Sequence, residues 1–182
     1  MTWLQAIGLA LIQAATEFLP VSSSGHLVLA RSLFGWSDEG GLAFDTALHS
    51  GSLAAVLAYF WRDWGRVLLS FRAPTSAETL FYRRLPWLVV LATVPAAATA
   101  PFVKDTLEFG VRSPATVGLS MLATALWFVL AERRHGRGNG AAPRHAEWRD
   151  AWRIGWAQVV ALLPGASRSG WTAAAGVMSG LD

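Results

Sequence analysis

The sequence contains no cysteine among its 182 residues, and only 15% of those residues are charged. The missing cysteines exclude disulfide bonds and thiolate metal sites, and they leave the redox compartment undetermined. The low charge argues against a soluble globular domain, in which about 25% of residues are charged. Instead, 53% of the residues are hydrophobic, ten are tryptophan, and the mean hydropathy is +0.37. This composition predicts a membrane protein with several helical spans.

The few charges are concentrated in separate segments. The net charge of +3 comes mostly from arginines in Arg62–Arg84 and Glu132–Arg153, whereas Lys104–Ser113 holds one lysine and one arginine. The positive-inside rule therefore predicts that the first two segments are cytoplasmic loops and that the third is a loop on the outer side. Because no basic patch is interleaved with aromatic residues, we expect no nucleic-acid partner.

Three apolar stretches are each close to the length of a helix that crosses a bilayer. These predicted spans are Gly41–Phe60, Pro86–Val103 and Pro114–Leu130.

Two further apolar stretches run into polar, helix-breaking sequence. Trp3–Leu19 is one of them; it predicts a half-helix, although it is long enough for a full crossing. Because the N-terminus lacks the basic region and the small-residue cleavage site of a signal peptide, we expect this stretch to remain in the mature protein. Ile154–Leu163 is too short to cross and predicts a half-helix, with Thr172–Leu181 as its return arm. Polar sequence at membrane depth is costly unless it lines a buried site.

The first break is Pro20-Val-Ser-Ser-Ser-Gly-His26. Upstream of it, Gln13 and Glu17 lie four residues apart and share one helix face. A carboxylate in an apolar run needs a partner, most simply a divalent cation or an arginine. The hydroxyls, the glycine and His26 lie at the start of the next helix, where free backbone N–H groups favour an anion. The serines alone would be explained as caps of a helix over His26–Phe34.

The second break is Pro164-Gly-Ala-Ser-Arg-Ser-Gly-Trp-Thr172. Arg168 offers forked donors to two phosphate oxygens and keeps its charge at any working pH. Its alternative role is to neutralise Glu17 without taking part in chemistry, and Thr172 can equally be a neighbour of a helix cap.

The two breaks are related to each other. Gly8–Gly25 and Gly155–Gly170 share a glutamine, a proline and then Ser-x-Ser-Gly, with spacings that differ by one or two residues. Two hairpins of opposite sense are typical of inverted repeats with the site at the repeat interface. We therefore expect an all-α, polytopic transmembrane protein with a re-entrant helix-loop-helix hairpin in each repeat. The single membrane domain would span 1–182, with repeats at 1–103 and 114–182.

Three motifs together resemble the undecaprenyl-diphosphate phosphatase family, also known for bacitracin resistance. They are Gln13-x-x-x-Glu17 with the first break, Phe44-Asp-Thr-Ala-Leu-His49-Ser-Gly51, and the second break. The resemblance implies an enzyme of the bacterial inner membrane, open to the periplasm, that removes the terminal phosphate of a C55 polyprenyl diphosphate to recycle the lipid carrier for cell-wall synthesis. It also implies a divalent cation, Mg or Ca, and contact with membrane lipids.

The resemblance also implies roles for individual residues. Glu17, Ser23, His26 and Arg168 are the predicted catalytic residues, and Glu17 with Gln13 would hold the metal. Substrate binding is assigned to the amide and hydroxyl groups of Gln13, Ser22, Ser24, Ser167, Ser169 and Thr172. Asp45 and His49 are expected to support the site without reacting.

Several alternatives stay open at this point. Ser23 can attack with His26 as base or acid, His26 can attack directly, or Glu17 can activate water, and we rank the serine route first because a lipid-facing pocket restricts water. Members of the family continue through further transmembrane helices beyond the point where this sequence ends, so we expect an incomplete second repeat, and a homodimer is one way to complete it. The rival function is a non-enzymatic lipid or solute transporter built on inverted repeats.

Overall fold

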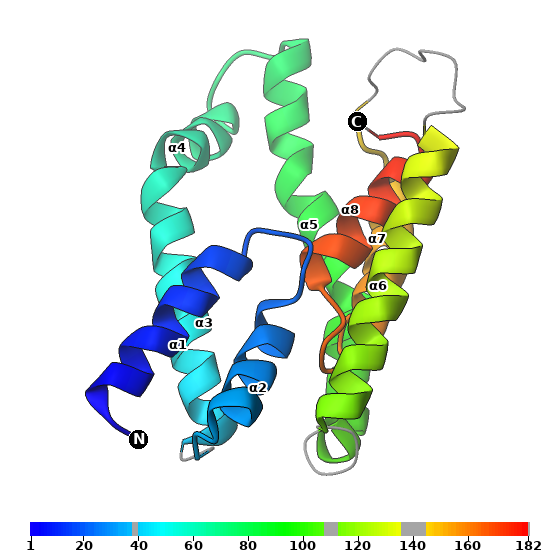
Figure 1. Ribbon diagram of the computed structural model, residues 1–182. Coiled ribbons are helices and arrows are strands. Elements are labelled where there is room, and N and C mark those ends of the chain that lie inside the picture. The colour runs from blue at the N-terminus through cyan, green and yellow to red at the C-terminus, as the bar shows by residue number, and fades with distance from the viewer. Residues whose placement is uncertain (38–39, 108–112, 136–144, 182) are drawn as a thin grey trace.

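The computed structural model describes residues 1–37, 40–107, 113–135 and 145–181. Within these ranges the chain forms eight helices and no strand (Figure 1), which confirms the predicted all-α class. The helices are α1 (Trp3–Thr16), α2 (Ser23–Phe34), α3 (Gly41–Tyr59), α4 (Trp61–Ser70), α5 (Ala77–Asp105), α6 (Pro114–His135), α7 (Trp148–Val160) and α8 (Arg168–Met178).

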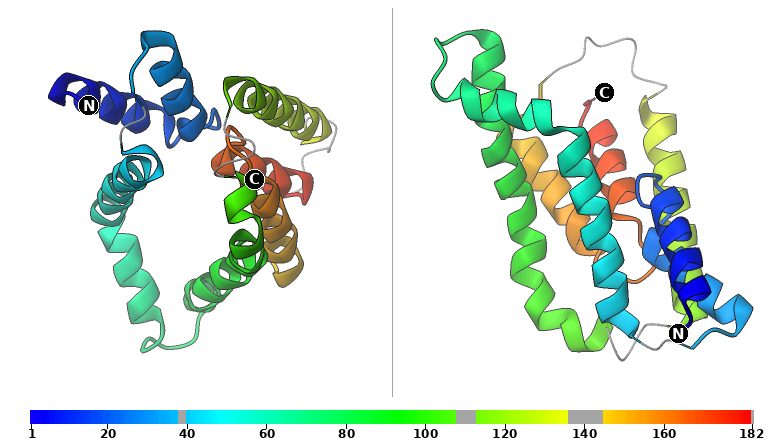
Figure 2. Two further views of the ribbon diagram at one scale, coloured as in Figure 1. Left: turned by 90° about the horizontal axis from the view of Figure 1, so that it is seen from below. Right: turned by 90° about the vertical axis from the view of Figure 1, so that its left-hand side faces the viewer.

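The helices form two packed groups. In the first group α1 packs against α2 and α3, and in the second α7 packs against α5 and α8, while α6 packs against α8. The groups meet where α2 contacts α6 and where α4 contacts α5, as the view from below shows (Figure 2). The two polar breaks therefore come from different groups.

The breaks connect two helical hairpins that run in opposite directions. In Figure 1, α1 rises from the lower end of the molecule and α2 returns to it, whereas α7 descends from the upper end and α8 returns upwards. The two connecting segments, residues 17–22 and 161–167, lie in the middle of the molecule.

Two helices in the described ranges are long and apolar enough to cross a membrane, Ala77–Lys104 and Pro114–Arg134. Only 22% and 17% of their most apolar windows are buried, unlike the core helix of a soluble protein. Helix α3 begins where the predicted span begins and ends one residue before it, but it is not among these two.

The predicted loop over Arg62–Arg84 was wrong. That segment contains α4 and the beginning of α5, so α5 starts nine residues before the predicted span at Pro86. Ser76 and Thr79 cap this start reciprocally. The Arg83 side chain donates hydrogen bonds to the backbone carbonyls of Ser70 and Ala73, so its charge is used within the protein rather than in a solvated loop.

The other helix limits also differ from the prediction. The expected loop at Glu132–Arg153 is shorter, because α6 runs to His135 and α7 begins at Trp148; residues 136–144 lie outside the described ranges. The half-helix expected at Ile154–Leu163 is α7, and its return arm begins at Arg168 instead of Thr172. For α6 and α7 the charged residues Glu132 and Arg153 were read as the edges of a loop, although charged residues such as these are good helix formers.

Candidate active site

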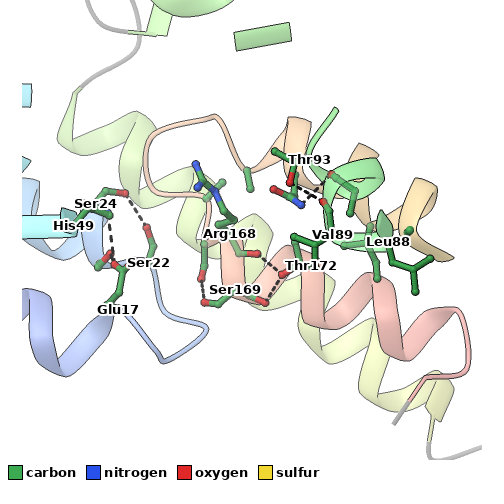
Figure 3. Close-up of a pocket in the computed structure, with 18 of the residues that line it drawn as sticks. Glu17, Ser22, Ser24, His49, Leu88, Val89, Thr93, Arg168, Ser169 and Thr172 are labelled. Carbon is green, nitrogen blue, oxygen red and sulfur yellow. Dashed lines mark hydrogen bonds and ion pairs between the residues drawn. The ribbon is translucent and has the colours of Figure 1, made fainter. Parts of the chain in front are cut away.

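One cavity of about 610 Å³ is shared by the two hairpins (Figure 3). The first hairpin contributes Glu17 and the three serines that follow it, and the second contributes the segment around Arg168. Of the ten side chains predicted for the site, all but Gln13 and His26 line this cavity. The lining set is Glu17, Ser22, Ser23, Ser24, Ser167, Arg168, Ser169 and Thr172.

Glu17 lies at the end of α1 and is held by hydrogen-bond donors. Its Oε2 atom accepts a hydrogen bond of 2.8 Å from the Gln13 side-chain amide and one of 2.5 Å from the Ser23 hydroxyl. Ser23 is the first residue of α2, so the chain reversal brings a hydroxyl and a carboxylate into direct contact. No arginine forms an ion pair with Glu17 in the described part of the chain, which argues against the alternative that Arg168 merely neutralises it.

Gln13 lies behind Glu17, outside the cavity. Its side chain is 2% exposed, and its Oε1 atom has no hydrogen-bond partner among the described residues. Because the amide nitrogen is committed to Glu17, this oxygen is a buried acceptor without a partner among the described residues, a group that an ordered water or an ion would satisfy.

His26 also lies outside the cavity lining. Its Nδ1 atom is 2.8 Å from the backbone carbonyl of Ser22. A carbonyl oxygen can only accept, so Nδ1 carries a hydrogen and donates it to that carbonyl. The hydrogen bond fixes the ring against the turn that carries the serines.

The two helix starts that border the cavity share one pattern of capping hydrogen bonds, although the cap backbones differ, with φ of 66° at Ser22 and −74° at Ser167. Ser22 caps α2 by accepting a 3.2 Å hydrogen bond from the backbone N–H of Gly25, and Ser167 caps α8 through an equal bond from Gly170. Each cap hydroxyl also contacts the serine two residues further on, Ser24 or Ser169. These serines therefore shape the turns as well as line the cavity.

The tips of the two hairpins touch each other. The Ser169 hydroxyl donates a 3.1 Å hydrogen bond to the backbone carbonyl of Leu19. A Cβ atom on Gly25 would lie 3.4 Å from the Cα atom of Gly165, so even the smallest side chain at Gly25 would contact the backbone of the second hairpin. This contact holds the Glu17 and Arg168 side chains at one cavity.

His49 also lines the cavity, and the sequence did not predict its contact with Glu17. From α3 its Nε2 atom reaches to 3.5 Å from Glu17 Oε2, and its Nδ1 atom lies 2.8 Å from the carbonyl of Asp45. The Asp45 carboxylate in turn forms a buried 2.6 Å ion pair with Arg31 of α2. The available signal was a histidine four residues after an aspartate in an otherwise apolar stretch, and it did not show which helix the histidine faces.

The opposite wall of the cavity is apolar. It is formed mainly by α5 and α7, with Leu85, Leu88, Val89, Ala92, Ala151 and Ile154. These helices approach closely at Gly155, where a Cβ atom would lie 2.9 Å from the Ala92 carbonyl, and the Gln158 amide donates a 3.0 Å hydrogen bond to that same carbonyl. The cavity thus joins a charged, hydroxyl-rich edge to an aliphatic wall, as an amphipathic ligand requires.

Comparison with known proteins identifies the group to which this chain belongs. Residues 6–182 match the family described as bacitracin resistance protein BacA. The chain is 42% identical over 197 residues to undecaprenyl-diphosphatase 2 of Stutzerimonas stutzeri, with all of this chain and 68% of the relative covered. It is 39% identical over 188 residues to undecaprenyl-diphosphatase 1 of Pseudoalteromonas translucida, with the same coverage. It is 41% identical over 188 residues to undecaprenyl-diphosphatase of Mycobacterium marinum, covering all of this chain and 64% of that protein.

The chain therefore spans about two thirds of the length of these relatives. Its two long apolar helices, which are mostly unburied, agree with the match. The chain is a membrane protein and belongs to the bacitracin resistance protein BacA family.

Proposed function

We propose that this protein is an undecaprenyl-diphosphatase, which removes the terminal phosphate of a C55 polyprenyl diphosphate and so recycles the lipid carrier for cell-wall synthesis. The names of the relatives support this function. The observation that carries it is the single cavity in which a serine hydroxyl donates to a carboxylate and an arginine lines the same space. Nucleophile, base and phosphate-binding cation are the groups that phosphoryl transfer requires.

Ser23 is the nucleophile in this proposal. Its oxygen attacks the terminal phosphorus while its proton passes to Glu17, to which it already donates at 2.5 Å. The phosphorus–oxygen bond to the lipid monophosphate breaks, and water then hydrolyses the phosphoserine. Ser22 and Ser24 are weaker candidates because their hydroxyls contact each other, and His26 lies outside the cavity.

Arg168 binds the transferring phosphoryl group. Its side chain is exposed to the cavity and forms no ion pair with any residue that the structure describes. A guanidinium with unused donors can stabilise the charge that spreads over the phosphoryl oxygens in the transition state. Ser169 and Thr172 line the same edge of the cavity and add hydroxyls near that charge.

A divalent cation, Mg or Ca, is part of the proposal. In the described ranges no group of three His, Asp or Glu side chains comes together as a protein-only metal site. Magnesium, however, is commonly held by one or two carboxylates together with substrate phosphates. Glu17 and the unpartnered Oε1 atom of Gln13 fit that arrangement. When bound, the cation would neutralise charge on the diphosphate oxygens.

The membrane arrangement belongs to the same proposal. We place inverted repeats at 1–103 and 114–182, each with a re-entrant hairpin, in the bacterial inner membrane with the site accessible from the periplasm. The opposite directions of the α1–α2 and α7–α8 hairpins and their matching helix caps support the repeats. The arginines beside α4 and α7 support a cytoplasmic location for that end of the molecule.

The test is phosphate release from a polyprenyl diphosphate in detergent. We expect release by the wild type, loss of release with EDTA and recovery with added Mg or Ca. Arg168→Ala should lower the rate at least about 100-fold, as removal of a transition-state donor does. Arg153→Ala removes the same side chain from the same hairpin outside the cavity and should leave the rate within about twofold. Release that is absent in the wild type, or undiminished in Arg168→Ala, would favour a transporter instead.

A further inference from the structure

A second cavity, of about 500 Å³, lies on the other side of the same polar edge. Ser24, His49 and Arg168 border both cavities. The second cavity is otherwise formed by the α2–α3 pair, the segment that connects α7 to α8, and the last part of α5. It has no part in the proposed bond-breaking step.

The two cavities follow one another along α5. The first is lined by residues between Leu85 and Thr93, and the second by Ala100, Lys104 and Leu107. A helix rises about 1.5 Å per residue, so Lys104 lies roughly 16 Å beyond Thr93 along the helix axis. Arg168 is at the junction of the two spaces, because it lines both.

The charged side chains around the second cavity favour an anion. Among its described lining residues, Lys104 and Arg168 are cations and Asp45 is the single carboxylate. Asp45 is already held by Arg31 in the buried 2.6 Å ion pair, so its charge is compensated. The first cavity, in contrast, presents Glu17 and an aliphatic wall.

We propose that Lys104 and Arg168 form a binding site for inorganic phosphate, through which the released phosphate leaves the site. This inference rests on the proposed phosphatase function. The lipid monophosphate stays beside the aliphatic wall of the first cavity, whereas a small dianion is drawn towards the neighbouring space that carries two cations. Arg168, which borders both spaces, passes the phosphate from the first to the second. The exit then lies at the end of the molecule where α5 finishes.

Direct binding of inorganic phosphate tests the site without any lipid substrate. Phosphorus NMR titration of the detergent-solubilised chain should give saturable binding in the wild type. Lys104→Ala should weaken it about tenfold, the loss of one charge-assisted contact, and Lys104→Arg should restore it. Arg72→Ala removes a charge outside both cavities and should leave the affinity unchanged. Absent wild-type binding, or equal affinity in Lys104→Ala, would overturn the site.

Product inhibition separates this site from substrate binding. Formation of the lipid monophosphate should be inhibited by added phosphate, and Lys104→Ala should require about tenfold more phosphate for half inhibition while the KM for the lipid stays within about twofold. A raised KM with unchanged phosphate inhibition would place Lys104 on the lipid diphosphate and refute the exit. If Lys104 only complements the end of the α5 dipole, neither quantity will change. An inactive wild type would refute the phosphatase function, and the NMR titration would still decide the phosphate site.

Discussion

The two hairpins that border the cavity share one capping pattern and carry different chemistry at the residue that follows the cap. In both, a serine caps the incoming helix through the N–H of a glycine three residues later and contacts the serine two residues on. The residue directly after the cap is Ser23 in the first hairpin and Arg168 in the second. A repeated turn thus presents a hydroxyl from one side and a guanidinium from the other.

The hairpins also differ in what anchors them. The first is tied to α3 by the buried Arg31–Asp45 ion pair. The second is tied to α6 by Thr124, whose hydroxyl accepts hydrogen bonds from the Trp171 indole and from the backbone N–H of Ser167. A charged anchor depends on both partners remaining buried together, whereas a neutral one depends on packing and modest hydrogen bonds.

The largest effect should come from the position that distinguishes the hairpins. Ser23→Ala removes the proposed nucleophile and should lower phosphate release at least about 10³-fold, because loss of a catalytic serine removes the covalent route. Ser24→Ala removes the adjacent hydroxyl, which contacts Ser22 instead of Glu17, and should cost less than about tenfold. Rates are measured on samples of equal folded fraction. Equal losses in the two variants would show that the hydroxyls act only as a group.

The next effect concerns the close approach of the second hairpin to α6. Gly165 has φ of +86°, and a Cβ atom there would overlap the backbone of Val117. Gly165→Ala should therefore lower the unfolding free energy by about 4 kcal/mol. Gly35 has φ of +61°, and an added Cβ atom there would meet nothing within 4 Å. Gly35→Ala therefore measures the cost of the backbone conformation alone, about 1 kcal/mol. Thermal unfolding in detergent measures the midpoints of both variants. Similar midpoints would mean that α6 shifts at Val117 and so removes the overlap.

The charged anchor of the first hairpin should follow. Asp45→Asn removes the carboxylate that lies 2.6 Å from the buried Arg31 guanidinium and should destabilise the protein by about 3 kcal/mol. The paired replacement Arg31→Met with Asp45→Leu removes both charges and should recover most of this loss. Chemical unfolding in mixed micelles measures the difference. If the paired variant is no more stable than Asp45→Asn, the loss of stability comes from the missing ion pair itself and not from a buried charge that lost its partner.

Local sequence signals predicted most of the site. Ser22–Ser24, Ser167 and Arg168 interrupt apolar stretches, and polar residues there are too costly to be incidental. The glycines three residues after each cap serine mark a helix start. For these reasons, eight of the ten predicted side chains line one cavity, with Gln13 and His26 the exceptions.

Tertiary contacts could not be predicted in the same way. The ion pair between Arg31 and Asp45 joins two residues that are fourteen positions apart and lie on different helices. Neither helix shows from its own pattern which face meets the other. His49 reaches Glu17 only because α3 packs on α1. The start of α5 was missed because its arginines resemble a cytoplasmic loop, whereas Arg83 folds back onto the preceding turn.

The smallest effect should come from the neutral anchor of the second hairpin. Trp171→Phe removes the 3.0 Å hydrogen bond to Thr124 but keeps an aromatic ring against Trp127, with which Trp171 stacks. We expect a loss of about 1 kcal/mol, the net value of one neutral hydrogen bond, measured by the same unfolding assay as for Asp45→Asn.

Thr124→Val is the matched control for that anchor. It leaves both the Trp171 indole and the Ser167 N–H without their acceptor, and an unpaired buried donor costs more than a lost hydrogen bond. Its effect should therefore exceed that of Trp171→Phe, and the double variant should be less destabilised than the sum of the two. If Trp171→Phe costs as much as Asp45→Asn, the contrast between charged and neutral anchors is wrong, and the two hairpins are held equally firmly despite their different chemistry.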